Sequence, residues 1–229
     1  MVIYPAIFFL GAAIASFLNV VAKSLPANQN WWSRRSASPC CQTVLQPTAL
    51  IPIISYLVQN GRCKACLAKI PPSYFWVELT GGLLFLTPLL LPRPYLLQSW
   101  LFIALLMTVT LTDFYYRLVP NKILIAFGVP LFLLQPQLAG AVTGFLFFYG
   151  AALIGHLLWK KPTIGGGDIK LYFVIGLILP IRPLLLSVVI ASGLALCYIL
   201  IFSQNKKQEI PFVPFIAAGS LLSYLLMYF

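Results

Sequence analysis

Long apolar segments constrain this chain more than any other feature of its sequence. They recur from one end to the other, and proline marks several of the short connections between them. A helix that crosses a bilayer needs roughly 20 apolar residues and satisfies its own backbone polar groups, because the hydrocarbon core supplies no water. The pattern therefore predicts an all-α polytopic membrane bundle with about eight transmembrane helices.

The expected segments share an apolar composition and differ mainly in length. They cover residues 3–22, 74–91, 95–112, 121–135, 138–159, 169–179, 183–203 and 211–228. The segment 169–179 is too short to cross a bilayer alone. Only 8% of the 229 residues are charged, whereas ordinary soluble domains contain about 25%. A mean hydropathy of +0.94 excludes a disordered chain and argues against a soluble enzyme.

The basic residues indicate the orientation in the membrane. The chain has 15 Lys and Arg against 4 Asp and Glu, a net charge of +11. In a soluble protein such an excess would suggest nucleic-acid binding, but in membrane proteins Lys and Arg collect in cytoplasmic loops. With the N-terminus outside, all of them except Arg93 and Arg182 fall on the cytoplasmic side. The sequence therefore predicts two extracytoplasmic termini.

One polar loop, residues 24–73, separates the first two expected helices and is far longer than usual helix connections. We expect it to form a small cytoplasmic subdomain. Together with its flanking helices it defines an N-terminal region, residues 1–92. Residues 93–229 then form the remaining membrane domain.

Two aspartates are expected at the same membrane depth. Asp113 ends an apolar run, and Asp168 follows Gly165-Gly166-Gly167 and opens another. Charged groups at that depth are costly and usually face a polar cavity. Two carboxylates that share a proton can hydrolyse a peptide bond, because one activates water while the other protonates the carbonyl oxygen. The helix dipoles favour Asp168 as the base and Asp113 as the acid.

The three consecutive glycines interrupt the helical pattern, which suggests a sharp bend or a close approach to substrate. Gly165, Gly166, Gly167 and Lys170 are therefore predicted to position backbone or substrate beside Asp168. Glu78 lies within the second apolar segment. We expect it to play a supporting structural role, as the partner of a Lys or Arg in the loop.

Four cysteines lie in the expected cytoplasmic loop, where reducing conditions disfavour a disulfide. Cys63 and Cys66 have the spacing of a zinc knuckle. Two interpretations stay open. Either the thiols carry no metal, or zinc is bound by Cys41, Cys63 and Cys66 with Cys40 or water in the fourth position.

Five short stretches occur in an order that carries more information than any one of them. They are Ser16-Phe17-Leu18-Asn19-Val20, Gly61-Arg62-Cys63-Lys64-Ala65-Cys66, Thr112-Asp113, Gly165-Gly166-Gly167-Asp168-Ile169-Lys170-Leu171 and Pro211-Phe212-Val213-Pro214-Phe215. In this order they resemble the type IV prepilin peptidase family, aspartic leader peptidases and N-methyltransferases of bacterial membranes.

The resemblance implies that Asp113 and Asp168 cleave the leader of type IV prepilin-like proteins at the cytoplasmic face of the bacterial plasma membrane. That step would need no cofactor. It also implies methylation of the new N-terminus with S-adenosylmethionine, a role for residues 1–92. The family often has an earlier Cys-x-x-Cys pair in the loop; here Ser38 stands at its first position and Cys41 at its second.

Two other function classes remain possible from the residues alone. In a transporter, Asp113 and Asp168 would bind the coupling ion or proton; carrier sites, however, usually lie near the bilayer midplane, between repeated halves that this sequence does not display. In a scaffold for pilus or secretion assembly, the chemistry would have been lost. The intact aspartates argue against that interpretation.

Overall fold

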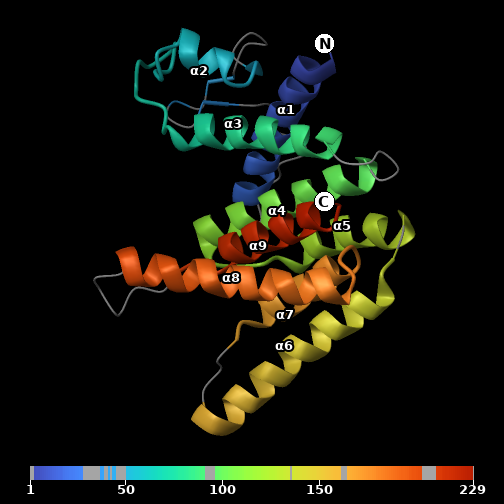
Figure 1. Ribbon diagram of the computed structural model, residues 1–229. Coiled ribbons are helices and arrows are strands. Elements are labelled where there is room, and N and C mark those ends of the chain that lie inside the picture. The colour runs from blue at the N-terminus through green and yellow to red at the C-terminus, as the bar shows by residue number, and fades with distance from the viewer. Residues whose placement is uncertain are drawn as a thin grey trace. The chain divides into compact units, whose positions relative to one another are not determined.

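The computed structural model describes residues 3–27, 37–38, 41, 43–44, 50–90, 96–134, 136–160, 164–202 and 210–228. The chain divides into two compact units, Met1–Arg93 and Pro94–Phe229. Figure 1 shows that both are built from helices. We call them the N-terminal and C-terminal units.

The N-terminal unit contains α1 (Ile3–Ser24), α2 (Ile54–Val58) and α3 (Ser73–Leu86), which continues into a short 3₁₀ helix, η2 (Thr87–Leu90). The α-helix of α3 ends before Pro88, because proline lacks the N–H that a continuing α-helix requires.

Glycines let α1 and α3 pack closely. A Cβ atom added to Gly11 would lie 2.5 Å from the Cβ of Phe85, and one added to Gly82 would lie 2.6 Å from the ring of Phe8. Small residues at such positions are typical of helices that associate within membranes. This contact fixes the two helices that flank the long polar loop.

The C-terminal unit contains six α-helices among the described residues. They are α4 (Leu96–Tyr116), α5 (Asn121–Leu134), α6 (Leu138–Trp159), α7 (Gly166–Gly176), α8 (Ile181–Phe202) and α9 (Val213–Leu226). Helix α4 is mostly buried, while α6 and α8 expose most of their residues, as lipid-facing helices would. Helix α9 packs against both α4 and α8, and α7 packs mainly on α6 (Figure 1).

The contact between α6 and α7 has no room for side chains at its centre. A Cβ on Gly140 would collide with the backbone oxygen of Leu179, and one on Gly176 would lie 2.5 Å from the oxygen of Gly140. Helix α7 has 11 residues, a length of only about 17 Å. Its packing on α6 therefore places a helix that is too short to cross a bilayer unaided.

All eight expected apolar segments contain a described helix, and α2 is an additional helix that the sequence did not predict. The all-α class is confirmed. Only 4 described helices, α1, α4, α6 and α8, are long and apolar enough to cross a membrane by themselves. The larger count of eight spans remains a prediction, because α3, α5, α7 and α9 have only 14, 14, 11 and 14 residues.

Candidate active site and thiol cluster

Asp113 lies in the last turn of α4, and its side chain is 7% exposed. The helix ends three residues later, and Arg117 has a positive φ of 54°. The Arg117 N–H donates to the Asp113 carbonyl at 2.8 Å. This hydrogen bond fixes the end of α4, so the carboxyl group of Asp113 has a defined position.

The N-terminus of α9 supplies a hydrogen bond to that carboxyl group. The Val213 N–H donates to Asp113 Oδ2 at 3.1 Å. Val213 is the first residue of α9 and is followed by Pro214, which has no N–H. Asp113 therefore occupies the place of a helix cap, although it comes from another helix. No feature of the sequence marks Val213 by itself. Only the proline at the second helical position indicates that a helix begins here.

Asp168 lies in the first turn of α7, where the helix dipole favours an acidic side chain. Its N–H donates to the carbonyl of Gly165 at 3.0 Å. A Cβ atom added to Gly167 would lie 3.0 Å from the Cβ of Val119. The start of α7 is thus packed against the segment that directly follows α4, which brings the regions carrying the two aspartates together.

The three glycines do not form the sharp bend that the sequence suggested. Gly166 and Gly167 are helical, and Gly165 precedes them with φ −66° and ψ 133°. Among the described residues, only Gly61 is a glycine with a positive φ. The glycines open α7, and the close contact at Gly167 gives one of them a steric reason to lack a side chain.

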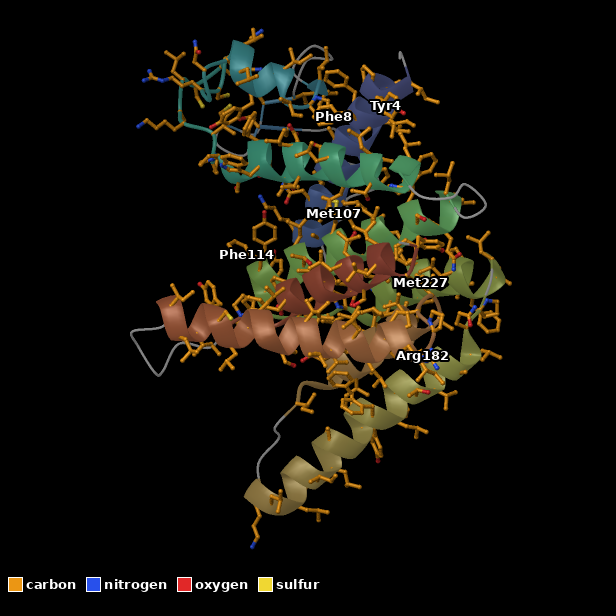
Figure 2. All side chains as sticks on the ribbon, in the orientation of Figure 1. Tyr4, Phe8, Met107, Phe114, Arg182 and Met227 are labelled. Carbon is orange, nitrogen blue, oxygen red and sulfur yellow. The ribbon has the colours of Figure 1, made fainter. Side chains whose placement is uncertain are left out.

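The two carboxyl groups interact electrostatically. Burial, and to a lesser extent the neighbouring Asp113, raise the pKa of Asp168 to about 6. Asp168 lies outside the four candidate membrane-spanning helices. Figure 2 shows Phe114, the neighbour of Asp113, at one end of the C-terminal unit, and Arg182 and Met227 at the other. The aspartates thus share one end of this unit.

These observations favour an assignment of roles opposite to the one expected from the helix dipoles. The Val213 N–H stabilises an ionised Asp113, whereas burial and the nearby Asp113 favour the protonated form of Asp168. Lys170 does not contribute an ion pair to either group in the described contacts. Its Nζ donates to Asn121 Oδ1 at 3.1 Å, which links α7 to the start of α5.

Glu78 connects three parts of the N-terminal unit. Its Oε1 accepts a hydrogen bond from the Ser16 hydroxyl at 2.8 Å, and its Oε2 accepts one from the Ile53 N–H at 2.8 Å. Ile53 has a positive φ of 65°, a conformation that costs energy for a β-branched residue. In the described part of the chain, the partners of Glu78 are therefore a hydroxyl and a backbone N–H instead of the basic side chain that we expected.

Three cysteines of the loop come together. The Sγ atoms of Cys41, Cys63 and Cys66 all lie within 4.8 Å of one another, and those of Cys41 and Cys63 are 3.8 Å apart. Cys40, the fourth predicted ligand, lies outside the described residues. The isolated bridges Ala37↔Val44 and Arg62↔Lys69 flank the cluster.

The surroundings of Cys63 favour a thiolate. The pKa of this thiol is lowered to about 6, mainly by the hydrogen bond of Ser38 and then by the backbone N–H groups of Cys66 and Ala65. The pKa of Cys41 is also lowered, mainly by the hydroxyl of Thr43. Thiolates are the form in which cysteines bind metal ions.

The cluster fits a zinc ion. Two sulfur ligands at about 2.3 Å from a tetrahedral zinc lie about 3.8 Å from each other. Cys41 and Cys63 already have that separation, and Cys66 is within reach of both. The described thiols therefore supply three of the four ligands that a structural zinc site requires.

Comparison with known proteins covers both units. The family described as Bacterial Peptidase A24 N-terminal domain matches residues 9–91, and the Type IV leader peptidase family matches residues 100–200. A Bacillus subtilis prepilin leader peptidase/N-methyltransferase is 36% identical over 96% of this chain and 92% of its own length.

More distant relatives carry related names. A prepilin leader peptidase/N-methyltransferase of Myxococcus xanthus is 31% identical over 81% of this chain and 59% of its own length. A type 4 prepilin-like proteins leader peptide-processing enzyme of Escherichia coli O78:H11 is 30% identical over 92% of this chain and 89% of its own. No solved structure matches the chain.

Proposed function

Because the chain belongs to the type IV prepilin leader peptidase/N-methyltransferase family, we propose that Asp113 and Asp168 cleave the leader peptide of type IV prepilin-like proteins. The observation that carries this assignment is the electrostatic interaction between the two carboxyl groups in the C-terminal unit, together with the contact between Gly167 and Val119 in the segments beside them. An ion carrier would also need acidic residues, but the family relationship favours peptide hydrolysis.

In the proposed mechanism Asp113 is the general base. It removes a proton from water, and the water oxygen bonds to the carbonyl carbon of the scissile peptide. Protonated Asp168 gives its proton to the carbonyl oxygen, which forms a neutral gem-diol. The C–N bond then breaks as Asp113 passes its proton to the leaving nitrogen, while a diol hydroxyl returns a proton to Asp168. Both carboxyl groups are thereby restored.

The Val213 N–H assists the base in this scheme. A hydrogen bond to the ionised form favours that form, so Asp113 stays charged while Asp168 carries the shared proton. The pair would titrate as a unit. The same N–H keeps the carboxylate pointed toward α9 and limits its rotation between turnovers.

We further propose that the site faces the cytoplasm in a bacterial cell membrane, with both termini outside and eight helices contributing to the membrane domain. The distribution of Lys and Arg along the chain supports this orientation. The leader of a prepilin-like substrate would then enter from the cytoplasmic side. Its apolar stem would remain in the bilayer.

The names of the relatives imply a second activity, methylation of the new N-terminus with S-adenosylmethionine. Glu78 is the only acidic residue in positions 1–93, and both of its oxygens already accept hydrogen bonds from protein groups. The described residues therefore do not assemble a carboxylate site for the cofactor's ammonium group.

The thiol cluster is proposed to bind one structural zinc ion through Cys41, Cys63 and Cys66. The ion would fix the two turns of the loop relative to each other. The ion would take no part in peptide cleavage, which depends on the aspartates.

The test of the peptidase is co-expression with a prepilin-like substrate. The wild-type chain should remove the leader, seen as a change in N-terminal mass. Asp168→Asn should reduce cleavage by about 10²–10⁴-fold while the protein still accumulates in the membrane. Cys197 is an exposed cysteine of α8. The Cys197→Ala variant is a matched control and should cleave normally. Normal processing by Asp168→Asn would remove that residue from the mechanism.

A further inference from the structure

Ser38 points into the thiol cluster. Its side chain is 2% exposed, and its Oγ lies 3.2 Å from the Sγ of Cys63. The backbone fixes this orientation, because the Ser38 N–H donates to the Thr43 carbonyl at 2.9 Å and the flanking residues Ala37 and Val44 form a bridge. A buried hydroxyl therefore lies beside Cys63, one of the three cysteines of the cluster.

The distance between the Ser38 hydroxyl and Cys63 is close to that between two ligands of one zinc ion. An oxygen at about 2.1 Å and a sulfur at about 2.3 Å from a tetrahedral zinc are about 3.6 Å apart. The observed 3.2 Å differs by a few tenths of an ångström, which a side-chain rotation of Ser38 can supply. Cys41 and Cys63 already have the spacing of bound ligands.

We propose that the Ser38 hydroxyl is the fourth ligand, so that the site binds zinc through three thiolates and one oxygen. This inference rests on the zinc binding proposed above and replaces Cys40 or water as the fourth donor. A neutral hydroxyl donates less charge than a thiolate, and the site would carry a net charge of −1 instead of −2. The bound ion should therefore exchange more readily than in a four-thiolate site.

The experiment uses the full-length protein in detergent, stripped with a chelator and reloaded with Zn²⁺ or Co²⁺. The variants are Ser38→Ala, Ser38→Cys and Cys40→Ala, with Cys197→Ala as the control outside the cluster. Metal content and chelator competition give the affinity for Zn²⁺. The visible absorption of bound Co²⁺ reports which atoms coordinate it.

We expect one metal ion per wild-type chain and per Cys197→Ala chain. Ser38→Ala should bind Zn²⁺ at least about tenfold more weakly, and Ser38→Cys more tightly. The Co²⁺ absorption of Ser38→Cys should shift toward that of a four-thiolate complex, a result that does not depend on Ser38→Ala folding well. Cys40→Ala should resemble the wild type.

Two results would overturn the role of Ser38 while leaving zinc binding intact. One is a Co²⁺ spectrum in Ser38→Cys identical to that of the wild type. The other is loss of affinity in Cys40→Ala together with wild-type affinity in Ser38→Ala, which would make Cys40 the fourth ligand. A different result, no metal bound by either the wild type or Ser38→Cys, would refute the zinc site itself. Leader cleavage by the aspartates would be unaffected by that outcome.

Discussion

The aspartate pair and the thiol cluster are built in different ways. Asp113 and Asp168 belong to helices that are separated in the chain by α5 and α6, and packing between helices brings them together. The bond from Val213 and the close contact of Gly167 with Val119 fix each one. The thiols belong to two short turns, and Cys63 and Cys66 are three residues apart.

The two regions also differ in how much apolar surface supports them. Helix α4 is mostly buried, whereas the short helix α2 has no buried residue. Leu57, Val58 and Leu67 are 58%, 69% and 70% exposed. These described residues bury little apolar surface, and such a segment usually needs a metal ion or another cross-link to hold it. We therefore expect the carboxyl groups to be preorganised by the fold and the thiols to be organised by their ion.

The largest predicted effect concerns Asp113. Asp113→Asn and Asp113→Ala should both reduce leader cleavage by about 10²–10⁴-fold, because neither side chain can act as a base. Their stabilities should differ. Asparagine still accepts the Val213 hydrogen bond, whereas alanine leaves a buried N–H without an acceptor, at a cost of about 1–3 kcal/mol.

Thermal unfolding in detergent and N-terminal mass analysis of a co-expressed substrate measure the two effects separately. Equal stability of the two variants would show that the bond between Asp113 and α9 contributes little. The preorganised character of the aspartate site would then lose its main support.

Metal removal should affect the thiol cluster. Chelation is expected to accelerate amide hydrogen exchange in residues 61–70 by about tenfold or more, since few buried contacts would remain to hold that segment. Exchange in α4 and α9 should stay unchanged. Cys63→Ala should produce the same pattern without chelator. If the loop exchanges equally slowly with and without metal, the loop is held by its own hydrogen bonds and the contrast with the aspartates fails.

The helices could be predicted from the sequence because their signal is local. Apolar runs bounded by proline and glycine identified all eight segments that contain described helices. The number of independent spans could not be predicted in the same way. Helix α3 ends before Pro88, and α7 packs on α6 at Gly140 and Gly176. Both features depend on local breaks in the helices combined with tertiary packing.

The candidate site shows the same division. Asp113 and Asp168 were found because charged residues are rare in this chain, 8% of it, and because both end or begin apolar segments. Their assignment as base and acid depended on helix dipoles alone. The structure adds the N–H of Val213 and the burial of Asp168, and neither can be read from the residues that surround the aspartates in sequence. The proximity of Ser38 to Cys63 likewise depends on tertiary structure and could not be predicted from the sequence.

A matched pair of glycine variants tests how tightly the helices define the aspartate site. A Cβ on Gly166 meets nothing within 4 Å, while one on Gly167 lies 3.0 Å from Val119. Gly166→Ala should therefore cleave normally, and Gly167→Ala should lose about tenfold in cleavage as the start of α7 shifts. Both proteins should accumulate equally. Equal cleavage by the two variants would mean that this contact does not position Asp168.

The last predicted effect is a dependence of stability on pH that arises from Asp168. Its pKa is raised from 3.8 to about 6 in the folded protein, so between these values the folded state binds more protons than the unfolded state. The free energy of unfolding should then fall as the pH rises from 3.8 to about 6, and this contribution should stay constant above that pH.

Comparison of variants isolates this contribution from that of other titrating groups. The difference between the unfolding temperatures of the wild type and Asp168→Asn should decline across the same pH window. Asp113→Asn should narrow the window, because removing the neighbouring negative charge lowers the pKa of Asp168. The Cys63→Ala variant should retain the full window. A difference that does not change with pH would mean that the pKa of Asp168 is not raised in the folded protein. A window that is unchanged in Asp113→Asn would mean that the two carboxyl groups act independently, and the packed helices would then not create the coupled pair that the mechanism requires.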